Sequence, residues 1–155
     1  MLRYFNIILI LTISITSSAQ NRIIKEVEDY ILRDFNEMIF VSIKNQKLYH
    51  IKNNKIINNF SISSSKYGTG NKNGSNKTPL GLHIIKEKHG KDVPINGKMV
   101  GRIFYNQIAA IYKDATESKT DDITSRILWL EGMEKGKNKG KGVDSYNRYI
   151  YIHGT

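Results

Sequence analysis

Residues 38–64 read MIFVSIKNQKLYHIKNNKIINNFSISS, and this stretch decides the fold class. Apolar and polar residues alternate along it with the period of a half-buried strand. Two Asn-containing pairs, 45–46 and 53–54, interrupt the alternation with residues that favour tight turns. The pattern therefore predicts an antiparallel meander of three short strands, the second at 47–52 and the third at 55–64.

Strand character returns three times toward the C-terminus, at 82–85, 125–131 and 147–153. The segments between them are rich in Gly, Asn and Lys, which predicts polar loops over 67–77, 87–99 and 132–144. The sequence shows no internal repeat and no domain boundary after residue 38. Together these patterns predict a mainly β, antiparallel domain over 38–155.

The residues before the meander divide into a leader and a helix. Residues 7–15 form an apolar run, and Ser17-Ser18-Ala19 follows with the small residues that signal peptidase requires. We expect a signal peptide over 1–19, cleaved after Ala19; a retained anchor is the alternative, although the run is shorter than the roughly 20 residues that span a bilayer. Apolar residues at helical spacing then predict one amphipathic helix over 20–37.

The leader predicts an exported protein, periplasmic or otherwise in the cell envelope, that contacts the membrane only if the leader is retained. The chain is strongly basic, with a formal net charge of +10 over 155 residues. Such charge suits nucleic acid or an anionic envelope polymer. Because export removes the protein from nucleic acid, we expect no nucleic-acid partner. The sequence contains no cysteine, so no disulfide framework supports the fold.

The candidate for chemistry is His153, which ends the last predicted strand and shares its face with Tyr149 and Tyr151. The other histidines, at 50, 83 and 89, lack the spacing of metal ligands, so neither a metal nor another cofactor is expected. No Gly-x-Ser-x-Gly motif is present, and the glycine-rich loop 67–77 lacks the Gly-Lys-Ser/Thr of a phosphate-binding loop.

Several segments, taken together, resemble the L,D-transpeptidase catalytic domain (YkuD family) over about residues 38–155. They are the hairpin 40–51, the Thr-Pro-x-Gly signature at 78–81, the strand 125–132, and the terminal Ile-His-Gly-Thr at 152–155. The resemblance implies a sandwich-like antiparallel fold. It also implies peptidoglycan stem peptides as substrates: a cysteine accepts the acyl group at an L,D bond and passes it to an amine.

By this resemblance His153 is the base that activates the cysteine, and Tyr151, Gly154 and Thr155 line the substrate beside it. The family motif continues into Ser/Thr-His-Gly-Cys, which the 155 residues do not contain. We therefore expect an incomplete catalytic domain, cut short before the nucleophile and inactive as written. The alternatives are a non-catalytic module whose basic loops hold peptidoglycan or another anionic polymer and, more weakly, an exported nucleic-acid binder.

Overall fold

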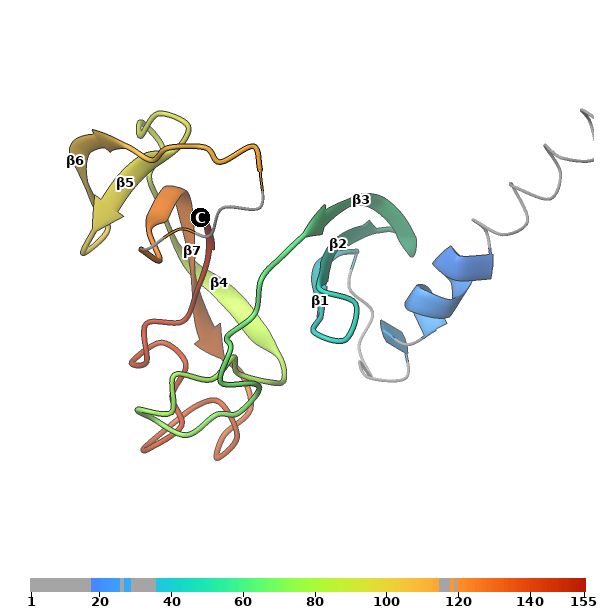
Figure 1. The fold of residues 1–155 in the computed structure, drawn as a ribbon. Helices are drawn as coiled ribbons and strands as arrows, with labels where there is room; N and C mark the ends of the chain where they lie inside the picture. The colour runs from blue at the N-terminus through green and yellow to red at the C-terminus, as the bar shows by residue number, and fades with distance from the viewer. Residues whose placement is uncertain (1–17, 26, 29–35, 115–117, 119) are drawn as a thin grey trace, which may run out of the picture. The chain divides into compact units, whose positions relative to one another are not determined.

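The computed structural model describes residues 18–25, 27–28, 36–114, 118 and 120–155. Within them the chain forms one short helical segment and eight strands (Figure 1). The strands are β1 (Glu37–Ser42), β2 (Lys47–Lys52), β3 (Lys55–Ser61), β4 (His83–His89), β5 (Gly97–Val100), β6 (Ile103–Ile108), β7 (Ile123–Gly132) and β8 (Tyr151–Gly154). The chain divides into two compact units, Met1–Ser64 and Ser65–Thr155.

The first unit contains the predicted meander, an antiparallel sheet in the order β1-β2-β3. Asn53 and Asn54, between β2 and β3, have φ angles of 48° and 56°, the left-handed backbone that a two-residue hairpin turn requires. The three-strand prediction is confirmed. Its last strand ends at Ser61 rather than Ser64, because the Ser64 amide bonds the side-chain oxygen of Gln46 (3.0 Å) instead of a neighbouring strand.

Residues 18–25 and 27–28 are helical, and the apolar side chains of Ile23 and Val27 are buried at helical spacing. The helix expected over 20–37 cannot reach its last position, since β1 already begins at Glu37. Residues 29–35, and nearly all of the expected leader at 1–19, lie outside the described residues. In the part of the chain that is described, no helix is long and apolar enough to span a membrane.

The second unit is a five-stranded antiparallel sheet built around β7. Both β4 and β8 pair with the segment 127–129 of β7, so they occupy opposite edges of this strand. β5 pairs with residues 123–124 on the same edge as β4, and β6 extends the sheet beyond β5. The mainly β, antiparallel architecture preceded by a helix is therefore confirmed.

β7 bends at Ser125, which has a φ of 61° and lies where the pairing register with β8 shifts. The Ser125 hydroxyl accepts a hydrogen bond from the Asn96 amide (2.8 Å), and Arg126 donates to the carbonyl of Val93 (2.6 Å). These bonds hold the 90–96 connection against the bend. The bend lets β4 and β5 follow one another along a single edge.

The core of the second unit is a buried cluster of Met99, Ile127 and Trp129. Ile127 and Trp129 lie on one face of β7, directly opposite His153 and Tyr151 of β8. Cross-strand partners point to the same side of a sheet. The side chains of Tyr151 and His153 are therefore on the core-bearing face.

Two sequence predictions for this unit are corrected. The loop expected over 87–99 is shorter, because β4 runs to His89 and β5 begins at Gly97. The last strand, expected over 147–153, begins only at Tyr151. Residues 145–149 form turns, in which the amides of Arg148 and Ile150 bond the carbonyls of residues 144 and 145. Local turn bonds therefore replace the ladder that the Tyr-Ile alternation suggested.

Candidate functional site

His153 lies in β8, half-buried, with its ring Nδ1 2.8 Å from the carbonyl oxygen of Gly154. A carbonyl oxygen can only accept, so Nδ1 must carry the hydrogen. In the neutral ring Nε2 then keeps a lone pair, and none of the described residues gives it a hydrogen bond. A general base needs this protonation state.

Gly154 lets β8 approach β7 closely. It pairs with Thr124, and a Cβ at this position would lie 2.8 Å from the Thr124 hydroxyl and 3.1 Å from its carbonyl oxygen. Thr155 follows the strand and is exposed. The structure thus brings Tyr151, His153 and Gly154 together on one short strand and places Thr155 just beyond its end.

Tyr151 anchors β8 two residues before His153. Its ring meets Trp129 edge-on with centroids 5.5 Å apart, and its hydroxyl accepts a hydrogen bond from Arg102 Nη1 (3.1 Å). The Arg102 guanidinium also lies over the Trp129 ring, 4.5 Å from the centroid. The bond to the Tyr151 hydroxyl raises the pKa of Arg102. One cation therefore ties the strand of the candidate base to the core tryptophan.

Trp129 is also the centre of an aromatic stack. Tyr146 stacks on it at 4.1 Å between centroids and Tyr149 at 5.6 Å, and the indole N–H donates to the Tyr146 carbonyl (3.1 Å). Tyr149 has a φ of 57° and remains exposed. A turn, and not strand alternation, therefore brings Tyr149 to the same aromatic group as Tyr151.

Tyr146 connects this stack to charged groups of β4. Its hydroxyl donates to the Glu87 carboxylate, a bond that lowers the pKa of Glu87 and raises the pKa of Tyr146. The His89 ring bonds the same carboxylate (3.0 Å), and the Lys86 ammonium lies 4.1 Å from the centroid of the Tyr146 ring. The residues upstream of β8 are thus fixed to β4 as well as to β7.

A second histidine, His83 at the start of β4, has a superficially similar environment. Its Nδ1 lies 2.9 Å from the Gly81 carbonyl, so its Nε2 accepts a hydrogen bond from the Ser145 hydroxyl (2.8 Å). Burial lowers the pKa of His83 and favours the neutral ring. Ser145 is fully buried, so this Ser–His pair cannot meet a substrate.

The Thr-Pro-Leu-Gly segment at 78–81 is held by two side chains from the loop after β7. Asn138 donates to the Leu80 carbonyl (3.2 Å), and Glu134 accepts a hydrogen bond from the amide of Leu82, the residue just after the segment (2.6 Å). Gly81 has a φ of 103°, and a Cβ there would lie 2.0 Å from a Glu134 carboxylate oxygen. The glycine of the signature is therefore required by backbone angle and by space.

The model of the YkuD family, the L,D-transpeptidase catalytic domain, matches residues 36–155. The chain belongs to this family. Comparisons with curated proteins and with solved structures found no significant match. The match spans all eight strands and includes Tyr151, His153, Gly154 and Thr155. The suspected family is confirmed, and the family acts on peptidoglycan stem peptides at the cell envelope.

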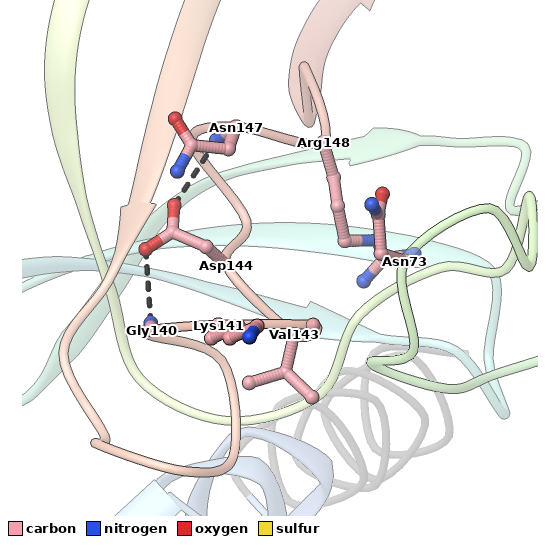
Figure 2. A pocket seen from close by; sticks show the side chains of 8 residues that line it. Asn73, Gly140, Lys141, Val143, Asp144, Asn147 and Arg148 are labelled. Atoms are coloured by element: carbon pink, nitrogen blue, oxygen red, sulfur yellow. Dashed lines mark hydrogen bonds between the residues drawn. The ribbon is translucent and has the colours of Figure 1, made fainter.

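A hollow of about 140 Å³ in this L,D-transpeptidase domain is lined by Asn73, residues 140–144, Asn147 and Arg148, none of which belongs to β8 (Figure 2). Figure 2 shows the Asp144 carboxylate beside it, bonded by the amides of Gly140 (2.9 Å) and Asn147 (3.0 Å). The Gly140 bond lowers the pKa of Asp144. Across the described residues, no group of three or more His, Asp or Glu side chains is placed to hold a metal ion.

Sequence reasoning did not find Arg102 or the Ser145–His83 pair. Arg102 lies in the β5–β6 turn with a φ of 71°, where a Gly-Arg pair between two apolar runs was its only signal. Ser145 and His83 are 62 residues apart, and no local pattern joins them. Both contacts exist only because β7 brings its neighbours together.

Proposed function

We propose that this domain performs the acyl transfer of L,D-transpeptidases on peptidoglycan stem peptides, with His153 as the general base. The observation that carries the proposal is the hydrogen bond from His153 Nδ1 to the Gly154 carbonyl, which leaves Nε2 able to take a proton. Its position on β8, inside the family match, supports this role.

In the proposed reaction, His153 Nε2 takes the proton of a cysteine thiol, and the thiolate attacks the carbonyl carbon of the L,D bond. The departing amine receives that proton, and a thioester remains. An acceptor amine then attacks the thioester, gives its proton to His153, and releases the thiolate with a new amide bond formed. Tyr151, Gly154 and Thr155 line the donor peptide beside the base.

The 155 residues contain no cysteine. We propose that the thiol comes from residues outside this sequence, and that the 155-residue chain alone forms no thioester. Removal of a nucleophile normally leaves only a small residual rate. We also propose that the leader is cleaved after Ala19 and that the mature domain works in the cell envelope; N-terminal sequencing of the exported protein tests the cleavage.

Intact-mass spectrometry with a carbapenem-type β-lactam, which acylates the thiol, tests the proposal. The chain as given should show no adduct. A form extended through the downstream reading frame to a Ser/Thr-His-Gly-Cys segment should gain one adduct. In that form His153→Ala should slow acylation by roughly 10²- to 10⁴-fold, the usual contribution of a general base. The matched variant His50→Ala, in β2, should leave the rate unchanged.

Three results would contradict the proposal. Undiminished acylation of His153→Ala would refute the base role. An adduct on the chain as given would refute the missing-thiol account. A downstream frame without the cysteine motif would leave no source for the nucleophile and would refute the completion by later residues.

A further inference from the structure

Nearly all of the net charge of the second unit belongs to two loops, 65–82 and 133–149, which we call the two-loop face. They carry eight basic and two acidic residues, whereas the rest of Ser65–Thr155 carries eight basic and seven acidic residues. The basic residues are Lys66, Lys72, Lys77, Lys135, Lys137, Lys139, Lys141 and Arg148. The strands and other connections are thus close to neutral, and the two-loop face has one sign.

The two loops form one surface because hydrogen bonds join them. The Asn73 amide donates to the Gly142 carbonyl (2.7 Å), and Arg148 donates to the carbonyls of Gly70 (3.3 Å) and Lys77 (2.8 Å). Figure 1 shows both loops at the same end of the unit, beyond the paired ends of β4 and β7. Arg148 acts as a brace inside this face, and its burial lowers its pKa.

Both acidic residues of the face are already hydrogen-bonded to groups of the same unit. The Asp144 carboxylate accepts hydrogen bonds from the backbone amides of residues 140 and 147. The Glu134 carboxylate accepts them from the Lys137 ammonium (2.8 Å) and from the amide of residue 82. In contrast, Lys72, Lys135 and Lys141 are exposed, and their ammonium groups form no ion pair with any described residue. The positive potential of the face therefore reaches solvent uncompensated.

The kind of charge indicates the kind of partner. Seven of the eight cations are lysines, which bind phosphate groups as compact point charges, through charge density and release of counterions, and not through the planar match that arginine makes to both carboxylates and phosphates. The exposed rings on the loops are Tyr67 and Tyr149, and each has one side occupied, by Lys66 and by Trp129. The face lacks the row of open rings that stacks successive nucleic-acid bases.

We infer that the two-loop face docks a linear phosphate-bearing polymer without bases, of the polyol-phosphate type, in the cell envelope. The loop 133–149 follows β7 at Gly132, and the loop 65–82 leads into β4 at His83, the partner of Gly132. His153 lies opposite Ile127 and Gly154 opposite Thr124, toward the other end of β7. A polymer on the face leaves the candidate base uncovered. The docking goes beyond the proposed function and is independent of the base and the thiol.

Binding of long-chain inorganic polyphosphate to the full chain, measured by fluorescence anisotropy over a salt series, tests this inference. The variant Lys72→Gln/Lys135→Gln/Lys141→Gln removes three charges from the face. The control Lys88→Gln/Lys91→Gln/Lys113→Gln removes three charges from the same unit outside it. We expect the face variant to bind roughly 10- to 100-fold more weakly at low salt, with a log–log salt slope smaller by about 2. The control should stay within about twofold of the unchanged chain.

Several outcomes would overturn the inference. Absence of binding at low salt would remove the docking face. Equal losses in the two variants would show that total charge, and not the face, is responsible. Tighter binding of a single-stranded oligonucleotide or of polyglutamate, at matched numbers of charges, would replace the phosphate polymer by nucleic acid or by a carboxylate polymer. We expect His153→Ala to bind polyphosphate as tightly as the unchanged chain. A loss of polyphosphate binding therefore tests the docking face, and a loss of acylation tests the base, independently of one another.

Discussion

Two histidines of neighbouring strands lie opposite two different regions of β7. His83 of β4 lies opposite Gly132, and His153 of β8 lies closer to the other end. In both rings Nδ1 bonds a glycine carbonyl, that of Gly81 at 2.9 Å and that of Gly154 at 2.8 Å. Nδ1 is therefore held in the same way in both histidines.

The second nitrogen makes the difference. Nε2 of His83 accepts a hydrogen bond from the fully buried Ser145, whereas Nε2 of His153 has no hydrogen bond from any described residue. A carbonyl on Nδ1 orients a ring and selects its tautomer. The Nε2 of His83 is thus occupied by a buried hydroxyl, whereas the open Nε2 of His153 can accept a proton from a group brought beside it. The comparison teaches that Ser145 locks His83 at the Gly132 end of β7, whereas His153, nearer the middle of the strand, is left open for the base role proposed above.

The largest expected loss of stability comes from adding a methyl group at Gly132, the end of β7 that lies opposite His83. In Gly132→Ala the Cβ would lie 2.0 Å from the Asn138 carbonyl oxygen and 2.4 Å from its carbon, both backbone atoms. We expect a loss of about 3 kcal/mol or more in the free energy of unfolding. Gly154→Ala first meets the Thr124 hydroxyl at 2.8 Å, a side chain that can turn, and should cost about 1 kcal/mol. Urea unfolding measures both, and equal losses would contradict this difference between the ends.

A smaller loss of stability is expected from removing the Ser145–His83 hydrogen bond without adding atoms. Ser145→Ala removes the hydroxyl that bonds His83 Nε2 and leaves a half-buried acceptor unpaired. The free energy of unfolding should fall by about 1–3 kcal/mol. The exposed Ser61→Ala should change it by less than about 0.5 kcal/mol. A loss at Ser145 no larger than at Ser61 would show that the Ser–His pair is not a lock.

The burial of His83 should also make the free energy of unfolding depend on pH. Because burial lowers the pKa of His83, the unfolded chain binds a proton at this residue more readily than the folded chain. The contribution is fully present above about pH 6.5, the ordinary histidine value, and is lost as the pH falls toward the folded pKa. Charged neighbours of the ring are Glu134, Lys137 and Arg148. Urea midpoints between about pH 6.5 and 5 should decline less in His83→Gln, and an unchanged decline would contradict the assignment.

The smallest effect on the protein is expected at β8, where Arg102 ties Tyr151 to Trp129. Arg102→Gln removes the cation from the tryptophan face and should loosen β8 without unfolding the unit. Amide exchange of Tyr151–Gly154 should become several-fold faster. Arg102→Lys keeps a cation over the ring and should recover part of the protection. Faster exchange throughout the sheet would show that Arg102 supports the whole unit and not β8 in particular.

The sequence predicted elements whose signals are local. The meander could be read because Asn53 and Asn54 supply their own turn conformation and the alternation on either side is short-range. The strand at 125–131 was found for the same reason, as the apolar part of β7. The start of β8 was misread, because turn bonds formed by residues 144–150 compete with a Tyr-Ile alternation that looks like a longer strand.

The candidate site could be predicted only in part. His153 was identified from its place at a strand end, and the resemblance gave it a role. Its tautomer depends on the direction of the Gly154 carbonyl, which no sequence pattern specifies. The brace on Tyr151 comes from Arg102, and the lock on His83 comes from Ser145, both across long separations in the chain. Long-range contacts of this kind need the sheet to exist first.

The most direct test of the central claim is the tautomer of His153, read by long-range ¹H–¹⁵N NMR correlation of the imidazole nitrogens in the full chain. At a pH where the ring is neutral, we predict a proton on Nδ1 and a free lone pair on Nε2 for His153. His83 should show the same tautomer, and only its signals should change in Ser145→Ala. A proton on Nε2 of neutral His153 would contradict the account, because that ring could not accept the thiol proton at the position proposed.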